Sequence, residues 1–371
     1  MTTGTTYYEG LAQRVVFGAG AARGELAGEV KRLGASRLLL VAGESELPLA
    51  RELVAGLPVV AEFSGVRAHV PIEVARAARR AAREAGADLL VSVGGGSTTG
   101  TAKAVALSEG LPILAVPTTY AGSEATPVWG ITEDGRKTNG SDPVVLPRTV
   151  IYDAELTLTL PTGLTVASGL NAVAHCVDSL WAPQANPVST ASALEGLRCL
   201  AAGLPVVRSD GQDIAARHEC LEGTYLAAVA FAGAGSGMHH KICHVLGGAY
   251  DLEHAAMHAV LLPHVVGFNA AAVPGAATRL ASALAGAGFG DGSSAVAGLS
   301  ALYAALDAPR RLADLGLAEQ DLDEAASLSL EKIPPSNPRP VSREQIRTLL
   351  HRAWAGLEPE AVPLVPLEGT P

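Results

Sequence analysis

The pattern of apolar residues changes near residue 160, and this change restricts the chain to a narrow set of folds. Before it, strands are predicted at 14–17, 37–41, 59–63, 87–93 and 112–117, with helices between them at 25–33, 48–56, 71–84 and 98–107. Strands that alternate with helices at this spacing predict a parallel sheet covered by helices on both faces. From residue 161 on, only helices are predicted. We therefore expect an α/β domain at residues 1–160 and an all-helical domain at residues 161–371.

A run of glycines directly follows the predicted strand 87–93. Gly94, Gly95, Gly96 and Ser97 lead from that strand into the predicted helix 98–107. Glycines let a phosphate approach the backbone, and the new helix offers free N–H groups and the positive end of its dipole. A dinucleotide pyrophosphate is the natural ligand, so residues 1–160 are interpreted as a dinucleotide-binding domain. A plain tight turn is the alternative, because Thr99 replaces the third glycine of the G-x-G-x-x-G pattern.

Other polar residues lie near the same predicted edge of the sheet. Thr118, Thr119 and Ser123 follow the predicted strand 112–117, and parallel sheets bind ligands at the carboxyl ends of their strands. Residues 128–132 and 148–152 are predicted to form a hairpin-like excursion around a polar loop. Lys137 on that loop is either a contact for the cofactor or a carboxylate, or an ordinary turn lysine. Lys103, on the helix after the glycines, is interpreted as a surface lysine rather than a phosphate contact.

Histidines concentrate in one short part of the helical domain. Six of the ten histidines lie between residues 237 and 264, namely His239, His240, His244, His254, His258 and His264. If residues 238–245 are helical, His240 and His244 lie one turn apart on one face. Gly247 and Gly248 are predicted to end that helix, so that the chain folds back and brings His254 near His240.

A second predicted helix adds two polar groups to this site. Asn171 and His175 are four residues apart, so both side chains lie on one helical face. Together with His240 and His254 they would make a four-point site. Three converging imidazoles hold a divalent metal or polarise a substrate oxygen, and the alternative is a set of ordinary core and surface histidines.

Charge, apolar runs and cysteines exclude several classes of protein. The formal net charge is −10 and no block of Lys or Arg is present, so nucleic acid is not expected as a partner. The N-terminus, MTTGTTYYEG, has no signal-peptide pattern, and the longest apolar run, 225–238, is shorter than the ~20 residues of a membrane span. The four cysteines, 176, 199, 220 and 243, show no C-x-x-C spacing. They indicate free thiols in a reducing cytoplasm, so we expect a cytoplasmic protein without a membrane partner.

Several motifs together resemble those of the iron-containing alcohol dehydrogenase superfamily. Its GGGS phosphate loop is found at residues 94–97, its P-T-T loop at 117–119, its G-S-E segment at 122–124 and its L-T-L-x-L-P boundary segment at 156–161. His175, His240 and His254 fill the three histidine positions of its metal motif. His244 fills the position of a further active-site histidine. The resemblance covers nearly the whole chain and implies the architecture that the superfamily shares with dehydroquinate synthase.

Asn171 stands where metal-dependent members of the superfamily have Asp. The maleylacetate reductase branch has the same Asn-x3-His spacing, the string H-H-K-x-C-H-V-L-G-G, found here at 239–248, and a late N-P-R-P, found at 337–340. The resemblance thus implies an enzyme that uses NAD(H) or NADP(H) and binds no metal, because a neutral Asn lacks the anionic oxygen that suits Fe²⁺. Glu44, after the second predicted strand, would bond a ribose hydroxyl and favour NADH. We also expect a homodimer.

The resemblance further implies a reaction. Maleylacetate is a small dicarboxylate whose C=C bond is conjugated to a ketone, and its reduction gives 3-oxoadipate in the degradation of aromatic compounds. A hydride from the nicotinamide would add at the carbon β to the ketone, and negative charge would develop on the ketone oxygen as an enolate. The catalytic residues that we expect are His175, His240 and His254 with Asn171 around that oxygen, and His244, or failing it His239, as the proton donor.

The remaining expectations concern the substrate carboxylates and the unmatched histidines. Lys241 and Arg339 are expected to bind the carboxylates, and the alternative for both is a surface ion pair. His258 and His264 match no motif and are expected to contribute much less.

Two other functions stay open at this stage. One is a metal-dependent alcohol dehydrogenase of the same superfamily, because three histidines alone can hold Zn²⁺. The other is a cyclase of the dehydroquinate synthase type. It would need a metal and a phosphate-binding basic cluster in the helical domain, and the sequence shows no such cluster.

Overall fold

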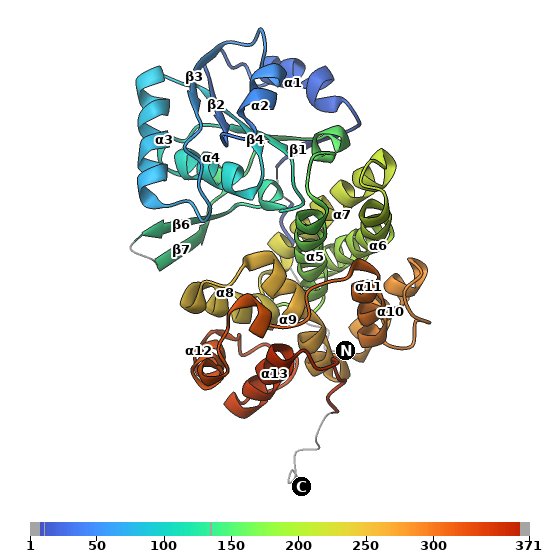
Figure 1. The fold of residues 1–371 in the computed structure, drawn as a ribbon. Coiled ribbons are helices and arrows are strands. Elements are labelled where there is room, and N and C mark those ends of the chain that lie inside the picture. The colour runs from blue at the N-terminus through green and yellow to red at the C-terminus, as the bar shows by residue number, and fades with distance from the viewer. Residues whose placement is uncertain (1–7, 11, 134–135, 364–371) are drawn as a thin grey trace.

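In the computed structural model, which describes residues 8–10, 12–133 and 136–363, a parallel sheet with its helices precedes a helical region (Figure 1). The sheet has the strand order β1-β8-β5-β4-β2-β3, and every neighbouring pair is parallel. Its strands are β1 (Arg14–Phe17), β2 (Leu38–Ala42), β3 (Val59–Phe63), β4 (Leu89–Gly94), β5 (Ile113–Pro117) and β8 (Thr149–Tyr152). The helices between them are α1 (Ala21–Arg32), α2 (Leu47–Leu53), α3 (Ile72–Ala85) and α4 (Gly96–Glu109). The predicted α/β fold class is confirmed.

The order of the strands marks one edge of the sheet for ligand binding. β2, β4 and β5 are buried at every position, as expected for central strands covered on both faces. β2 and β4 are neighbours, but the chain leaves β2 toward β3 and leaves β4 in the opposite direction, toward β5. Open α/β sheets bind ligands outside the carboxyl ends of the strands at such a switch point. Here that point lies just after Ala42 and Gly94.

The predicted pairing of residues 128–132 with 148–152 is wrong. β6 (Val128–Glu133) pairs antiparallel with β7 (Arg136–Ser141) in a separate two-stranded sheet, while β8 lies between β1 and β5 in the main sheet. The four residues of β8, TVIY, are all buried, so this strand needs neighbours on both sides and helices on both faces. Apolar content alone did not distinguish these two arrangements.

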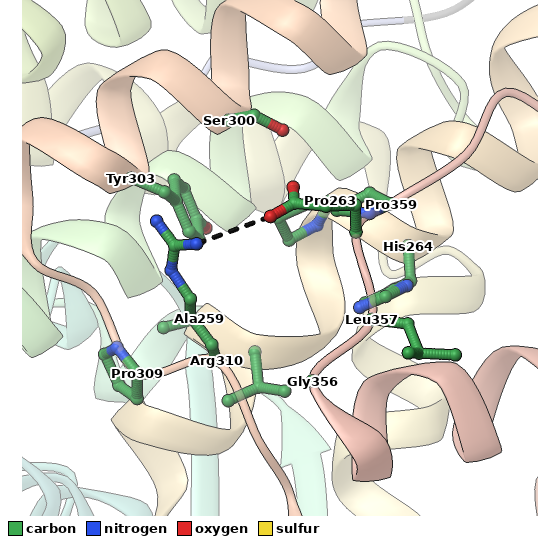
Figure 2. Close-up of a pocket in the computed structure, with 12 residues that line it drawn as sticks. Ala259, Pro263, His264, Ser300, Tyr303, Pro309, Arg310, Gly356, Leu357 and Pro359 are labelled. Atoms are coloured by element: carbon green, nitrogen blue, oxygen red, sulfur yellow. Dashed lines mark hydrogen bonds and ion pairs between the residues drawn. The ribbon is translucent and has the colours of Figure 1, made fainter.

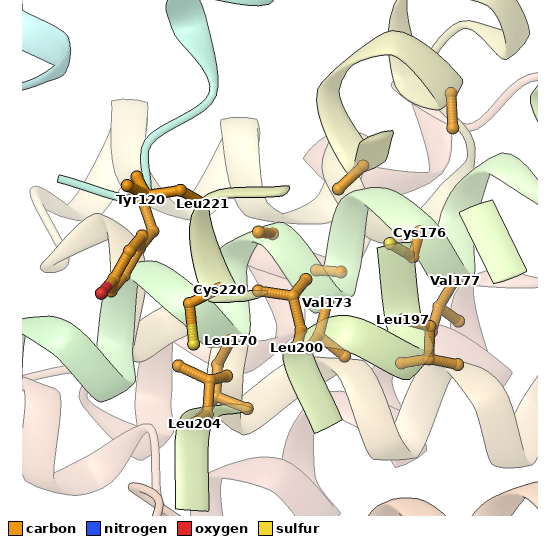
Figure 3. Packing of buried hydrophobic residues seen from close by; sticks show 14 of the residues in the cluster. Tyr120, Leu170, Val173, Cys176, Val177, Leu197, Leu200, Leu204, Cys220 and Leu221 are labelled. Carbon is orange, nitrogen blue, oxygen red and sulfur yellow. The ribbon is translucent and has the colours of Figure 1, made fainter. Parts of the chain in front are cut away.

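Beyond Tyr152, none of the residues that the structure describes belongs to a strand. The helices of this region are α5 (Thr162–Ser179), α6 (Pro187–Ser209), α7 (Ile214–Ala234), α8 (Met238–Tyr250), α9 (His254–Asn269), α10 (Pro274–Gly286), α11 (Ala295–Leu306), α12 (Leu322–Lys332) and α13 (Arg343–Ala355). α6 and α7 approach closely at Gly196, because glycine has no Cβ; an added Cβ there would lie 3.0 Å from the carbonyl oxygen of Gly223. Figure 3 shows apolar side chains of α5, α6 and α7 packed together with Tyr120, which belongs to the loop after β5. The sheet and the helical region therefore share one continuous core.

The prediction that Gly247 and Gly248 end the histidine-bearing helix is wrong. α8 continues through both glycines to Tyr250, and the helix ends at Asp251, which adopts the left-handed conformation with φ 52°. A glycine weakens a helix but stops it only where the backbone turns left-handed. α9 begins after only three further residues, so the chain still folds back as expected.

One helical segment, His254–Ala272, is long and apolar enough to cross a membrane by length and composition. However, 72% of that stretch is buried inside the protein. α9 packs against α5, α8, α11 and α13, and this central position explains its apolar composition.

Candidate active site

The glycine run forms an open cradle at the end of β4. Gly94 has φ 147°, and α4 starts two residues later at Gly96 with no side-chain cap among the described residues. An added Cβ would lie 2.5 Å from Thr98 Oγ1 at Gly94 and 3.1 Å from Thr119 Cγ2 at Gly95. The first N–H groups of α4 therefore stay accessible to a ligand, and the P-T-T loop lies against the glycines. Residues 94–97 and the P-T-T loop with Thr118 and Thr119 thus lie together at the carboxyl end of the sheet, and their role as a cofactor site stays a prediction.

Lys103 is neither a surface lysine nor a phosphate contact, so the sequence-based interpretation is wrong. Its side chain is completely buried, and Nζ donates hydrogen bonds to the carbonyl oxygens of Ser123, Thr126 and Val128 at 2.6, 2.8 and 2.7 Å. Burial lowers the pKa of Lys103 to about 7, and the nearby carboxylate of Glu124 opposes this shift. Three carbonyl acceptors use all three hydrogens of an ammonium group. Lys103 thus ties α4 to the segment that contains Ser123.

The segment held by Lys103 also contacts the helical region. Gly122 has φ 74°, and an added Cβ there would lie 3.0 Å from Cβ of Ala228 on α7. One turn farther along α7, the ring of Phe231 packs against the imidazoles of His175 and His240, with centroids 4.7 and 4.3 Å apart. The segment that contains Gly122 and the histidines are therefore linked by one helical turn of α7.

His240 of α8 and His175 of α5 lie face to face. Their rings are stacked with centroids 5.0 Å apart and an angle of 15° between the planes. His240 Nδ1 is bonded to the buried carboxylate of Asp178 at 2.8 Å. His175 Nδ1, His240 Nε2 and the neighbouring Asn171 Oδ1 are buried and have no hydrogen-bond partner among the described residues. The site thus presents polar atoms that are free to bond a ligand.

His239 points to the other side of α8 and forms a buried pair with His258 of α9. His239 Nε2 and His258 Nδ1 are 3.0 Å apart, and Cys243 Sγ lies 3.7 Å from His239 Nε2. The three ligand atoms lie within 4.8 Å of one another, which is close enough for a metal ion. However, His239 Nε2 and His258 Nδ1 already bond each other. The other ring nitrogens, His239 Nδ1 and His258 Nε2, have no partner among the described residues, whereas metal-bound histidines usually have one that orients the ring. We interpret the three residues as a hydrogen-bonded cluster.

His244 and His254 occupy the more open side of the site. Both are exposed and both interact with neighbouring groups. The rings of His240 and His244 are 6.3 Å apart, and those of His254 and His258 are 4.4 Å apart. The structure therefore brings together the four histidines predicted from the sequence, at 175, 240, 244 and 254, and adds His258 to the group.

Burial decides the charge of the inner histidines. It lowers the pKa values of four imidazoles well below the ordinary value of a histidine, namely those of His175, His239, His240 and His258. Neighbouring histidines lower these values further. These rings are neutral at neutral pH, so each presents one N–H and one lone pair.

The predicted carboxylate contacts have different outcomes. Arg339 is buried, donates to the carbonyl oxygens of Phe268 and Val362 at 3.0 and 3.2 Å, and lies over the Phe268 ring. These contacts tie it to the end of α9 and leave no role in a substrate site, so this expectation is corrected. Lys241 is half-buried on α8 beside His240. Lys137 lies in β7 opposite Thr132, and its side chain is outside the described residues.

The pocket in Figure 2 is separate from the histidine site. It is lined by residues of α9 and α11 and by the segment after α13, including His264, Tyr303 and Arg310, which pairs with Glu358. None of the candidate site residues lines it. Burial lowers the pKa of His264 to about 4. His264 therefore stands apart from the site, as its absence from the motifs predicted.

Three residues near the histidines were missed by the sequence analysis. Asp178 follows Asn171 and His175 at the next same-face position of α5, so the i, i+4, i+7 spacing was a usable signal. His258 follows His254 by four residues and was dismissed because it matched no motif. No sequence signal pointed to Phe231, because an aromatic residue in an apolar helix is an ordinary core residue.

Comparison with known proteins covers both parts of the chain. A family model described as iron-containing alcohol dehydrogenase matches residues 12–154, and one described as Fe-containing alcohol dehydrogenase family, C-terminal, matches residues 165–354. A maleylacetate reductase of Burkholderia cepacia is 45% identical over 354 residues, which cover 95% of this chain and 98% of the relative.

Two solved structures have closely similar folds. An iron-containing alcohol dehydrogenase from Corynebacterium glutamicum superposes with a TM-score of 0.92 at 48% identity, covering 95% of this chain and 98% of the other. A maleylacetate reductase from Agrobacterium tumefaciens superposes with a TM-score of 0.91 at 43% identity, covering 96% and 100%.

Proposed function

Because the chain belongs to the iron-containing alcohol dehydrogenase family, we propose that this oxidoreductase reduces the C=C bond of maleylacetate with NADH or NADPH. The observation that carries the proposal is the group of buried, unpartnered polar atoms on Asn171, His175 and His240. They lie one helical turn of α7 from the segment that contains Gly122. The maleylacetate reductases at 42% to 46% identity over most of the chain support the choice of substrate.

The glycine cradle fits the pyrophosphate of a nicotinamide cofactor. A side chain at Gly94 or Gly95 would fill the space in front of α4, and the site lies at the switch point of the sheet. Residues 94–97, Thr118, Thr119 and Ser123 would hold the cofactor, and Lys137 stays a predicted contact. Glu44 follows β2 beside this point and supports a preference for NADH, because its carboxylate would bond a ribose hydroxyl. The bound cofactor supplies the hydride.

The histidines account for the substrate side of the proposal. The imidazoles of His175 and His240 are buried and neutral, and each carries an unpartnered polar atom, while His254 would close the same site from its more open side. Donors fixed in a dry site stabilise charge that develops on the ketone oxygen. His244, on the open side of α8, is the proposed proton donor to the neighbouring carbon. Lys241 beside His240 remains the candidate for binding a substrate carboxylate.

An iron ion, which the family name implies, does not fit the side chains of this site. Asn171 offers a neutral amide oxygen where a hard cation prefers a carboxylate. Within the described residues, the ligand atoms of His175, His240 and His254 do not all lie within 4.8 Å of one another, whereas those of the neighbouring His239 cluster do. We therefore propose that the reaction needs no metal.

The test is oxidation of NADH and NADPH by the purified protein on maleylacetate and on simple aldehydes, with and without a chelator. We expect turnover of maleylacetate that survives chelation, and little turnover of aldehydes. Loss of activity on chelation with rescue by one divalent metal, or a preference for aldehydes, would contradict the proposal. Gly95→Val is the cofactor control: the added side chain meets Thr119, so cofactor binding should weaken strongly.

A further inference from the structure

Asp178 makes two short polar contacts in the histidine region, although no motif pointed to it. It lies on α5 with its side chain completely buried. Its Oδ2 accepts a hydrogen bond from Gly237 N and lies within hydrogen-bonding distance of His240 Nδ1, both at 2.8 Å. An added Cβ at Gly237 would lie 2.6 Å from Asp178 Oδ1, so only glycine permits this approach. Asp178 therefore joins α5 to the first turn of α8, where His240 stands.

The bond that Gly237 donates to Asp178 Oδ2 bears on where the hydrogen of His240 lies. The backbone N–H of Gly237 can only donate, and a carbonyl or carboxylate oxygen accepts such a bond much better than the hydroxyl oxygen of a protonated carboxyl group, so this contact favours an Oδ2 without a hydrogen. If the carboxyl group carried a hydrogen, that hydrogen would sit on Oδ1, which has no partner among the described residues. With no hydrogen on Oδ2, the hydrogen of the neutral His240 ring lies on Nδ1, which donates it to Oδ2. His240 Nε2 then bears a lone pair.

The direction of that lone pair decides which kind of substrate group His240 can bind. His240 Nε2 is buried and unpartnered within the part of the chain that the structure describes. The ring is held on one face by His175 and on its flank by Phe231. A ring fixed in this way cannot turn to exchange its two nitrogens without breaking the bond to Asp178.

We propose that Asp178 is a positioning residue that holds His240 in its Nδ1–H tautomer, so that Nε2 meets the substrate as a hydrogen-bond acceptor. This role rests on the proposed function of the site and revises one part of it. His240 binds a hydrogen-bearing group, and donation to the ketone oxygen is left to the other histidines. The general rule is that a carboxylate behind a histidine selects its tautomer and direction.

The test is ¹⁵N NMR of protein labelled at histidine, with the His240 signals assigned from a His240→Gln variant. Wild-type His240 should show the Nδ1–H tautomer. Asp178→Leu removes the acceptor, so the Nε2–H tautomer should appear and kcat on maleylacetate should fall about 10- to 100-fold, while NADH affinity stays unchanged. Asp178→Asn can still place an oxygen at the Oδ2 position, so it should keep the tautomer and recover most of kcat.

Asp153 provides the matched control. It is also completely buried and accepts hydrogen bonds from backbone N–H groups, those of Gly20, Ala22 and Glu155, but it belongs to the sheet domain and has no contact with His240 among the described residues. Asp153→Leu should lower stability without changing the His240 signals. An Nε2–H tautomer in the wild type, or equal loss of kcat in the Leu and Asn variants at position 178, would overturn the proposal. Because the tautomer is read without substrate, failure on maleylacetate alone would refute the proposed substrate and leave this inference standing.

Discussion

The protein contains two buried polar clusters that differ in how well their atoms are partnered. Around Lys103, the ammonium group donates to three carbonyl oxygens, and Tyr152 donates to the neighbouring Glu124 at 2.7 Å. Around His240, six side-chain atoms have no partner among the described residues, on Asn171, His175, Asp178, His239, His240 and His258. Buried polar atoms without partners are rare in folded proteins. The comparison indicates that the Lys103 cluster stabilises the fold, whereas the histidine cluster has polar atoms available to bind a ligand.

The largest expected effect is on the stability of the first cluster. Lys103→Met leaves three buried carbonyl oxygens without donors, so the free energy of unfolding should fall by about 3–5 kcal/mol. Urea unfolding measures this change. Lys31→Met, at an exposed position of α1, is the control and should stay within about 0.5 kcal/mol of the wild type. Equal stability of the two variants would show that the Lys103 contacts contribute nothing.

The next largest effect should appear in catalysis. His240→Ala should lower kcat about 100-fold or more, by analogy with the loss of one preorganised group in an active site, while KM changes less. Steady-state kinetics with maleylacetate measures both values, and NADH binding and thermal unfolding check that the variant is folded. A folded, NADH-binding variant with near wild-type turnover would make the histidine cluster structural, like the Lys103 cluster.

A smaller effect separates the two histidines that match no motif. His258 bonds His239 and contacts His254, so His258→Asn should lower kcat about tenfold through the positions of its neighbours. His264 lines the pocket that is separate from the site, and His264→Asn should leave kcat close to the wild-type value. Equal rates for the two variants would remove His258 from the active site.

The last effect is the pH dependence of stability, which is spread over three pH units. Burial lowers the pKa of Lys103 from 10.5 to about 7, so between these values the unfolded chain binds more protons and rising pH favours the folded state. The charged group that faces Lys103 is Glu124. From pH 7 to 10, wild-type stability relative to Lys103→Met should rise by up to about 1 kcal/mol per pH unit. A flat difference would mean that the three carbonyl oxygens keep the ammonium group charged throughout.

The parts of the site that were predicted correctly depend on local sequence. Gly94 to Ser97 follow a buried strand and open a helix, and that order alone places N–H groups before a phosphate. The spacing of Asn171 and His175, and of His240 and His244, gives a shared helical face wherever the helices pack. In both cases the geometry arises within one or two turns of a single element.

The parts that were predicted wrongly depend on what a distant element supplies. Lys103 looked like a surface lysine because its acceptors, the carbonyls of Ser123, Thr126 and Val128, come from a segment 20 to 25 residues away. Arg339 looked like a substrate contact because nothing in the N-P-R-P string shows that the carbonyl of Phe268, 71 residues away, takes its guanidinium. The role of a polar side chain depends on its hydrogen-bond partner, and in both cases that partner is distant in the sequence.

The sequence alone thus determined the type and order of the elements: a parallel α/β sheet first, then helices, with glycines at the end of one strand and histidines on two helical faces. Apolar periodicity and glycine conformations specify these features locally. The tertiary structure alone decided that β8 enters the main sheet, that Lys103 is buried, and that Asp178 aims the lone pair of His240 at the site. The reason is physical: these outcomes depend on which helices and strands approach each other, and hydrogen bonds form only over distances that packing sets.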